Sequence, residues 1–210
     1  EVMKREEIVK RFSIDRINDS PATFDAEKLE WMNGVYIRNM DEDTLMGHLL
    51  PFMERPESEG GLPDSVTRPI DREYLKRLLP LVHERLKLLT EGTETLDFFF
   101  ANNVSPAAED LLGRKMDIEM TERALATALE LCKTATSFEP EHLETEYRAL
   151  AEQIEMKPGQ LFSPIRVATT GKPFAPPLFD TMSAIGQDRC IERIENALSV
   201  LRSAAPASTD

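Results

Sequence analysis

The sequence predicts an all-α protein made of two consecutive helical subdomains. Apolar residues recur at three- and four-residue spacing along several segments, and residues that favour helix N-termini precede many of them. No region alternates between apolar and polar residues for long enough to predict a β-strand. We expect helices arranged as a bundle or cage, with residues 1–110 in the first subdomain and residues 111–210 in the second.

The first helices follow from periodicity and capping. Residues 2–11 carry apolar side chains on one side and should form a helix. Asp25 is typical of an N-cap and predicts a helix that begins at Ala26. Trp31 lies off the apolar stripe of that helix, so we expect it to pack on a neighbouring segment.

Two further aspartates predict the next helices. Asp41 should cap a helix over residues 42–53, and Asp71 a longer one that ends near Leu89. Pro80 lies inside the longer helix, where it lacks a backbone donor and clashes with the preceding turn. We therefore expect this helix to bend or to split.

The remaining elements complete the helical pattern. Phe98–Phe100 should fill the core where the subdomains meet, and Ser105, followed by proline, should cap a short helix. Asp117 is expected to cap an amphipathic helix. Two more helices are expected at residues 139–156 and 188–204, followed by a frayed tail.

Residues 159–179, GQLFSPIRVATTGKPFAPPLF, are the segment around which the second half is organised. Four prolines within 14 positions fix φ and withhold backbone donors, so we expect an irregular, pre-shaped segment rather than a plain helix or strand. Bases stack on aromatic rings and phosphates pair with Arg or Lys, so this composition suits a single-stranded nucleic acid site. Its cations and rings are Arg166, Lys172, Phe162, Phe174 and Phe179.

The overall charge limits the kind of nucleic acid binding. The net charge is −13 and the pI is near 4.8, which counts against indiscriminate binding. Between Arg148 and Phe179, however, four basic residues outnumber two acidic ones. An RNA site in an otherwise acidic protein would favour one RNA over polyanions in general. A local excess of basic residues, however, also arises by chance.

Several classes of protein are not expected. No apolar run approaches the roughly 18 residues of a membrane span, and the charged N-terminus is not a signal peptide. Cys132 and Cys190 lack metal-ligand spacing and predict reduced thiols in the cytoplasm. We expect a monomer without a membrane partner, and the start at Glu1 suggests a piece of a longer protein.

Signatures of catalysis are missing from this sequence. His48, His83 and His142 occur singly, and no HExxH or GxSxG motif is present. Arg166 occupies the position where a P-loop would need its first glycine. We therefore expect no catalytic residue, no metal site and no cofactor in this chain.

Two stretches resemble glutamyl-tRNA synthetase. Residues 164–171, PIRVATTG, and residues 176–179, PPLF, resemble a P-[LI]-R-x-A-x-T-G followed by P-x-L-F in the family's C-terminal anticodon-binding domain. Residues 24–38, FDAEKLEWMNGVYIR, resemble the family's segment just after its catalytic core. The matches occur in the family's order and at about its spacing. They imply a helical region that recognises a tRNA anticodon.

The resemblance also implies a larger parent enzyme. This family joins glutamate to its tRNA with ATP and Mg²⁺, and its two ATP-binding signatures would lie upstream of this chain. The chain would hold the anticodon loop of tRNA(Glu), with no role toward DNA. Catalysis, ATP and Mg²⁺ would belong to the rest of the parent.

The resemblance gives Arg85 a specific role. In the family, an arginine at the matching place reads the third anticodon base and rejects glutamine tRNA, and forms that accept both tRNAs tend to lose it. Arg85 thus implies an enzyme that discriminates against glutamine tRNA. A wrong base that leaves a buried donor unpaired weakens the binding free energy by about 1–3 kcal/mol. The alternative is that Arg85 only lays its long stem along apolar surface.

Two more arginines are candidates for RNA contact. The planar fork of Arg166 could bind a base edge or a phosphate, or it could cap a neighbouring helix through its carbonyls. Arg148 has the spacing of a family arginine that contacts the anticodon arm, and its alternative is a surface ion pair.

The end of the segment resembles the family's loop around the first anticodon base. Ala175, Pro176, Leu178 and Phe179 match this loop, which implies apolar contact and backbone hydrogen bonds to the base. Ala175 stands where known members carry Thr, so a hydroxyl contact is in doubt. Alternatively, Leu178 and Phe179 begin the next helix and face the core.

Two other functions remain open at this point. A helical protein-interaction module would also have an acidic surface and apolar helices, and it predicts no salt-dependent affinity for tRNA. A synthetase-like protein that kept this region for another purpose would differ only in its upstream sequence.

Overall fold

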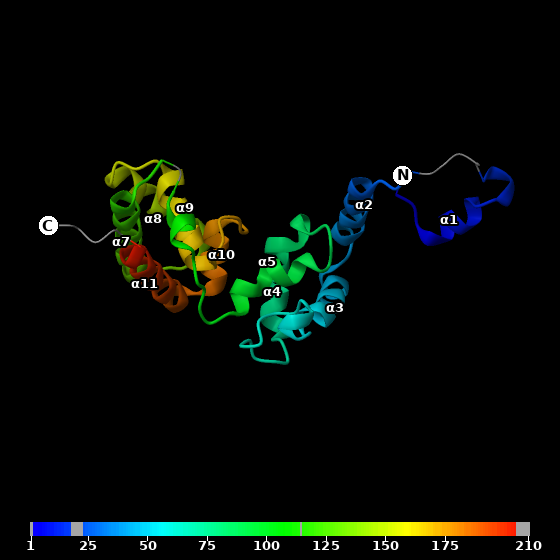
Figure 1. The fold of residues 1–210 in the computed structure, drawn as a ribbon, viewed down its shortest axis with the longest axis horizontal. Coiled ribbons are helices and arrows are strands. Elements are labelled where there is room, and N and C mark those ends of the chain that lie inside the picture. Colours follow the sequence, from blue (N-terminus) through cyan, green and yellow to red (C-terminus); the bar gives the residue numbers. More distant parts are fainter. Residues whose placement is uncertain (1, 18–22, 114, 205–210) are drawn as a thin grey trace.

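The computed structural model describes residues 2–17, 23–113 and 115–204 of the protein. Within these residues the chain is helical and forms no strand, which confirms the predicted all-α fold (Figure 1). The predicted frayed tail lies outside the described residues. Helices α1 to α11 are Arg5–Arg11, Ala26–Arg38, Glu42–Met53, Arg72–Val82, Glu91–Phe100, Ala108–Leu111, Ile118–Thr134, Pro140–Gln153, Pro158–Thr170, Leu178–Ile185 and Gln187–Ala204.

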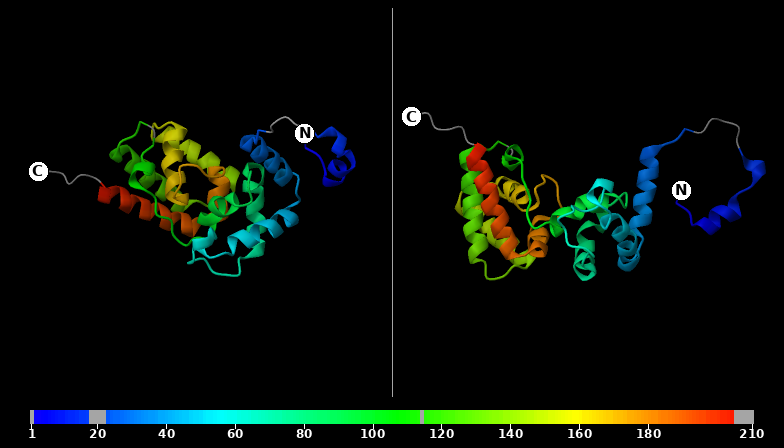
Figure 2. Two further views of the ribbon diagram at one scale, coloured as in Figure 1. Left: turned by 45° about the vertical axis from the view of Figure 1, so that its right-hand side comes forward. Right: turned by 60° about the horizontal axis from the view of Figure 1, so that its bottom comes forward.

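The helices gather in two groups along the molecule. Helices α2 to α5 lie together, α7 to α11 form the second group, and α1 projects beyond α2 (Figures 1 and 2). The short α6 packs against α9 and α11, and α10 contacts α4 across the two groups. The division into subdomains at residue 110 stays a prediction. Across the described residues, no helix has both the length and the apolar character that a membrane span requires.

Polar contacts join the two groups where α4, α5, α10 and α11 meet. The Tyr74 hydroxyl donates to the Ala184 carbonyl at 2.9 Å. Arg189 donates to the Phe99 carbonyl at 2.8 Å and to the Tyr74 hydroxyl oxygen at 3.0 Å. The partners are 90 to 115 residues apart in the sequence, so this joint fixes one group against the other.

The aspartate caps are confirmed. The side chains of Asp25, Asp41, Asp71 and Asp117 each accept a hydrogen bond from a backbone N–H in the first turn of the following helix, at 2.8–3.0 Å. Each cap satisfies a donor that the helix itself leaves free. These four residues fix where α2, α3, α4 and α7 begin.

Two local predictions are wrong. Trp31 is not buried against a neighbouring segment, because its side chain is 57% exposed. Ser105 does not cap the short helix, since α6 begins at Ala108 with Ala107 at the N-cap. Phe98 and Phe99 are fully buried, as expected, whereas Phe100 is only partly buried against the core; the three residues end the regular helix α5.

The long helix ends earlier than expected and is not split at Pro80, which lies inside the regular helix α4. Regular helix α4 stops at Val82, and a single 3₁₀ turn follows over His83–Arg85. Leu86 is already extended, with φ −70° and ψ 129°, so the predicted end near Leu89 is wrong. Proline removes one helical hydrogen bond and crowds the preceding turn. Arg85 therefore lies on the turn after α4 rather than within that helix.

The prediction for residues 159–179 is wrong over most of its first half. Residues Pro158–Thr170 form the regular helix α9, with Pro164 inside it, and only residues 171–177 are irregular. Pro158 is at the first helical position, where a missing N–H costs nothing. Burial of the apolar face outweighs the hydrogen bond that Pro164 removes. The buried apolar residues of α9 are Leu161, Pro164, Ile165, Val167 and Ala168.

Candidate RNA interface

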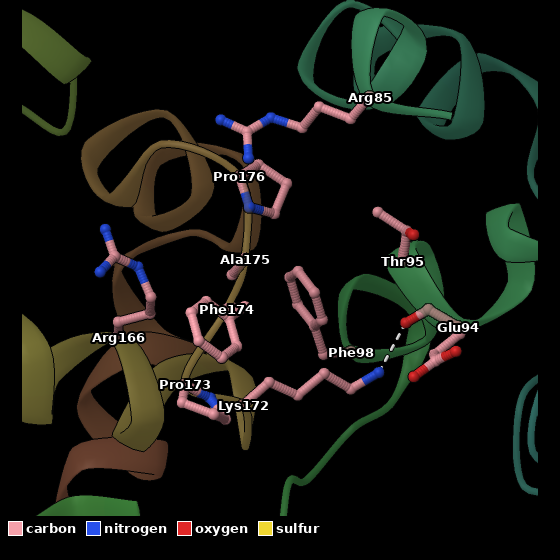
Figure 3. Close-up of a pocket in the computed structure, with 10 residues that line it drawn as sticks. All are labelled: Arg85, Glu94, Thr95, Phe98, Arg166, Lys172, Pro173, Phe174, Ala175 and Pro176. Atoms are coloured by element: carbon pink, nitrogen blue, oxygen red, sulfur yellow. Dashed lines mark hydrogen bonds between the residues drawn. The ribbon is translucent and has the colours of Figure 1, made fainter. Parts of the chain in front are cut away.

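A hollow of about 350 Å³ opens between residues 171–177 and the helices of the first group (Figure 3). We name it the Arg85–Arg166 hollow. It has three cationic side chains and one carboxylate along its walls, although the chain as a whole carries a net charge of −13. Its lining residues are Arg85, Glu94, Thr95, Phe98, Arg166, Lys172, Pro173, Phe174, Ala175 and Pro176.

The connection from α9 to α10 is fixed at both ends. Gly171 ends α9 in the left-handed region at φ 74°, which a glycine adopts without steric cost. The Thr170 hydroxyl donates to the Arg166 carbonyl at 2.7 Å and accepts the Lys172 N–H at 3.2 Å. At the other end Pro176 is buried. The residues between these anchors therefore hold their side chains in one set geometry.

Lys172 is a structural tether rather than a free cation. Its Nζ lies 2.8 Å from a carboxylate oxygen of Asp97, and the two side chains are 28% and 29% exposed. The same Nζ donates to the Glu94 carbonyl at 2.5 Å, which Figure 3 shows along the wall of the hollow. Both partners belong to α5, so Lys172 ties the irregular connection to the first group of helices.

Arg166 and Arg85 are the two cations of the hollow without such a tether. The Nε of Arg166 is buried and has no hydrogen-bond partner among the described residues. Burial, followed by the charge of Arg85, lowers the pKa of Arg166 below its ordinary value. Two guanidinium groups that repel one another form a site for an anion or for the electron-rich edge of a base.

The capping role left open for Arg166 belongs to another arginine, Arg193 on α11. Arg193 is 1% exposed and donates to the carbonyls of Thr169, Phe98 and Ala101 at 2.6–2.8 Å. These carbonyls lie at the ends of α9 and α5, where helix dipoles favour a cation. Burial lowers the pKa of Arg193 to about 10. Arg193 was not among the predicted site residues.

Arg148 lies outside the hollow. Its guanidinium donates to Glu144, one turn earlier on α8, at 2.6 Å and lies over the Phe162 ring at 5.7 Å from the centroid. The structure thus contains the surface ion pair that the sequence left as the alternative. A contact of Arg148 with the anticodon arm stays a prediction.

The four residues of the resembling loop divide into two pairs. Ala175 and Pro176 line the hollow, whereas Leu178 and Phe179 begin α10 and are only 5% and 7% exposed. The Phe179 ring packs edge-on against Phe162, with 5.1 Å between the centroids. The alternative, in which Leu178 and Phe179 face the core, is therefore confirmed for their side chains.

Metal-ligating residues do not cluster in the part of the chain that the structure describes. Within residues 2–17, 23–113 and 115–204, no three His, Cys, Asp or Glu side chains lie together as a metal site requires. Cys132 and Cys190 are buried free thiols. The hollow offers a ligand two guanidinium groups and two aromatic rings, those of Phe98 and Phe174, beside the tethered Lys172 and the Glu94 carboxylate.

The class of protein to which this helical fold with its cationic hollow belongs is that of anticodon-binding domains. Residues 44–198 match the anticodon binding domain family, and the chain belongs to this family. Its relatives include glutamate–tRNA ligases, which confirms the resemblance drawn from residues 164–171 and 176–179.

Two relatives show the extent of the similarity. The glutamate–tRNA ligase of Roseiflexus castenholzii is 44% identical over 204 residues, which are 97% of this chain and 39% of the relative. That of Chloroflexus aurantiacus is 42% identical over 210 residues, 98% of this chain and 41% of the relative. The chain thus spans about two fifths of the length of these ligases.

A solved structure shows the same fold at lower identity. The crystal structure of a glutamate tRNA ligase from Elizabethkingia meningosepticum superposes with a TM-score of 0.71 at 21% identity, covering 93% of this chain and 36% of that one. At this identity the likeness concerns the fold alone.

Proposed function

We propose that this chain recognises the anticodon loop of tRNA(Glu) within a glutamate–tRNA ligase. The observation that carries the proposal is the Arg85–Arg166 hollow, in which two guanidinium groups without tethers face a stiff, proline-rich connection. Single-stranded loops expose the base edges and phosphates that such a site can bind. Membership of the anticodon binding domain family supports this choice of ligand over other polyanions.

The two arginines have distinct tasks in this proposal. Arg166 projects from the rigid helix α9 and lines the hollow, and although its Nε is buried, the residue is only partly buried, so the exposed part of its guanidinium would bind an acceptor of the ligand. Arg85 projects from the turn after α4, on the opposite group of helices, and would read the third anticodon base. A base that offered no acceptor would leave Arg85 unpaired, which is how this residue would discriminate against tRNA(Gln).

Backbone groups near the start of α10 would hold the first anticodon base. Ala175 and Pro176 line the hollow and would supply apolar contact. The side chains of Leu178 and Phe179 are buried, so these residues would contribute through their N–H groups in the first helical turn. The absence of a hydroxyl at Ala175 makes no difference to such backbone contacts.

The parent enzyme would carry out the bond-making steps. We propose that it attaches glutamate to tRNA(Glu) in the cytoplasm, as a monomer, with ATP and Mg²⁺ bound by residues outside this chain. In this division of labour the chain orients the tRNA and checks its anticodon. Recognition at a distance from the reacting atoms raises specificity without contributing a catalytic group.

A titration with three RNAs tests the proposal. The chain and its variants Arg166→Ala and Arg85→Ala would be titrated with tRNA(Glu), tRNA(Gln) and an unrelated tRNA at low and moderate salt. We expect a preference for tRNA(Glu), which Arg166→Ala weakens about tenfold and Arg85→Ala relaxes toward tRNA(Gln). Arg202→Ala is the matched control, since Arg202 is an exposed arginine paired with Glu122 outside the hollow.

Equal affinity of the unchanged chain for all three RNAs would contradict anticodon recognition. Equal losses in Arg166→Ala and Arg202→Ala would show that binding depends on overall charge and not on the hollow.

A second candidate function, a protein-interaction module, is favoured by one observation. Large apolar side chains stand exposed toward the N-terminal end of the molecule, among them Phe12 at 67%, Ile14 at 76% and Trp31 at 57%. A surface of this kind suits contact with another protein surface. This candidate predicts no salt-dependent affinity for tRNA.

A further inference from the structure

Phe174 has the most exposed large apolar side chain in the described chain, at 89%. Most other exposed side chains of this type lie between residues 8 and 36. Beyond residue 36, the only other described residues with an exposed large apolar side chain are Leu88 and Leu112, at 38% and 37%. The exposure of Phe174 is therefore exceptional within the body of the protein.

Stiff backbone holds Phe174 in this exposed position. Pro173 precedes it, and Pro176 and Pro177 follow after Ala175, so three of its close neighbours have a fixed φ. Lys172, two residues before it, is tethered to Asp97 and to the Glu94 carbonyl. Such a backbone limits movement of the segment that carries the ring, so Phe174 keeps its place beside the hollow.

The ring stands beside the cationic wall of the hollow. Figure 3 shows Phe174 between Arg166 and Phe98, on the same connection as Ala175 and Pro176. Arg166 and Arg85 complete the walls around this region. An aromatic face next to guanidinium groups can stack on a nucleobase while the cations bind its edge or its phosphate.

We infer that Phe174 is a stacking platform for an unpaired base of the anticodon loop. The inference rests on the proposed function and adds to it a residue that matches none of the motifs described above. Stacking is tolerant of base identity, because every base has a π-face. Phe174 would therefore contribute affinity and base position, while Arg85 supplies the discrimination.

Fluorescence of a modified RNA tests the inference. An anticodon stem-loop of tRNA(Glu) would carry 2-aminopurine at one loop position at a time, and its fluorescence and affinity would be measured with the chain and with Phe174→Leu. We expect quenching at one loop position, because stacking on the ring changes the environment of that base. Phe174→Leu should abolish the quenching and weaken binding about tenfold, which lies within the usual range for one stacked base.

Two further variants make the result specific to the ring. Phe174→Tyr keeps an aromatic face and should retain both the quenching and the affinity. Phe24→Leu changes a phenylalanine that is 79% exposed outside the hollow and should leave both unchanged.

Three outcomes would overturn the inference. If Phe174→Leu bound with unchanged affinity and quenching while Arg166→Ala lost affinity, stacking would be wrong and the proposed function would stand. Equal losses for Phe174→Leu and Phe174→Tyr would exclude the aromatic face as the cause. If the unchanged chain bound no stem-loop, the proposed function itself would fail, and the inference with it.

Discussion

Arg193 shows how a single buried charge can position a binding site. Its guanidinium bridges the C-terminal ends of α9 and α5. Helix α9 carries Arg166, and α5 carries Asp97, the partner of Lys172. No carboxylate is among its hydrogen-bond partners, so the carbonyls of two helix ends stabilise the charge. The relative placement of the two walls of the hollow therefore depends on this residue.

Replacement of Arg193 should destabilise the protein strongly. Arg193→Met would leave three carbonyls at the helix ends without this donor, and we expect the free energy of unfolding to fall by about 3 kcal/mol. Urea denaturation measures this change. Arg202→Met, on the same helix but 61% exposed, should cost less than about 1 kcal/mol. A loss below 1 kcal/mol for Arg193→Met would contradict the structural role of its charge.

The buried thiol of Cys132 predicts a pH dependence of stability. Burial raises its pKa from an ordinary value of 9.0 to about 11, so the folded state keeps a proton that the unfolded state loses. The stabilisation is complete below pH 9 and declines as the pH rises toward 11. Cys132→Ala should flatten the decline in unfolding free energy over this window. Identical pH slopes for the variant and the unchanged chain would contradict the assignment.

At the scale of the element, the end of α9 determines the path of the connection that lines the hollow. Gly171 takes φ 74°, a conformation that L side chains adopt only with strain. The turn sends Lys172 toward α5 and leaves Phe174 exposed. A glycine at this one position thus links the helix to the geometry of the site.

A pair of glycine substitutions in and after α9 tests this role. Gly171→Ala should lower the free energy of unfolding by about 1 kcal/mol because of its left-handed backbone. Gly159→Ala should be neutral or slightly stabilising, because Gly159 is helical and no atom lies within 4 Å of an added Cβ. Thermal or urea unfolding distinguishes the two. Equal stability of both variants would contradict the backbone argument.

The start of a helix was predictable from the sequence where a residue next to that start determines it. Each aspartate cap acts within its own first turn, so α2, α3, α4 and α7 begin where the capping residue indicates. Pro164 misled the prediction for α9, because the burial that compensates for it comes from contacts with distant helices. The weight of such contacts cannot be obtained from a short window of sequence.

The site itself was predictable in part. The resemblance identified Arg85, Arg166, Ala175 and Pro176, which the fold brings to one hollow from positions up to 91 residues apart. Arg193 was missed, although a signal for it existed. It lies on the buried side of α11 with Cys190, Ile194 and Ala197, at helical spacing. A charged residue on an apolar stripe is a sign of a buried structural role.

At the scale of the whole molecule, the net charge limits where an RNA could bind. A chain with a net charge of −13 repels a polyanion except where cations gather, as they do at the Arg85–Arg166 hollow. In the proposed function, recognition would depend on a few contacts at this hollow. A site of this kind would suit a protein that chooses one RNA from many.

The affinity for RNA should depend only weakly on salt, because few cations line the hollow. If Arg85 and Arg166 are the main phosphate-neutralising groups, affinity should fall no more than about tenfold between 50 and 200 mM salt. A filter-binding or fluorescence titration at several salt concentrations measures the slope. A loss of about a thousandfold over the same range would instead indicate many phosphate contacts along an extended surface.

Recognition of the anticodon by this chain is open to direct measurement. Its most direct test compares the affinity for tRNA(Glu) with that for the same tRNA carrying a different anticodon triplet, since all other nucleotides stay identical. We expect the exchange to weaken binding at least tenfold, and Arg85→Ala to reduce the difference when only the third anticodon base is changed. Equal affinity of the unchanged chain for the two tRNAs would contradict anticodon recognition by this domain.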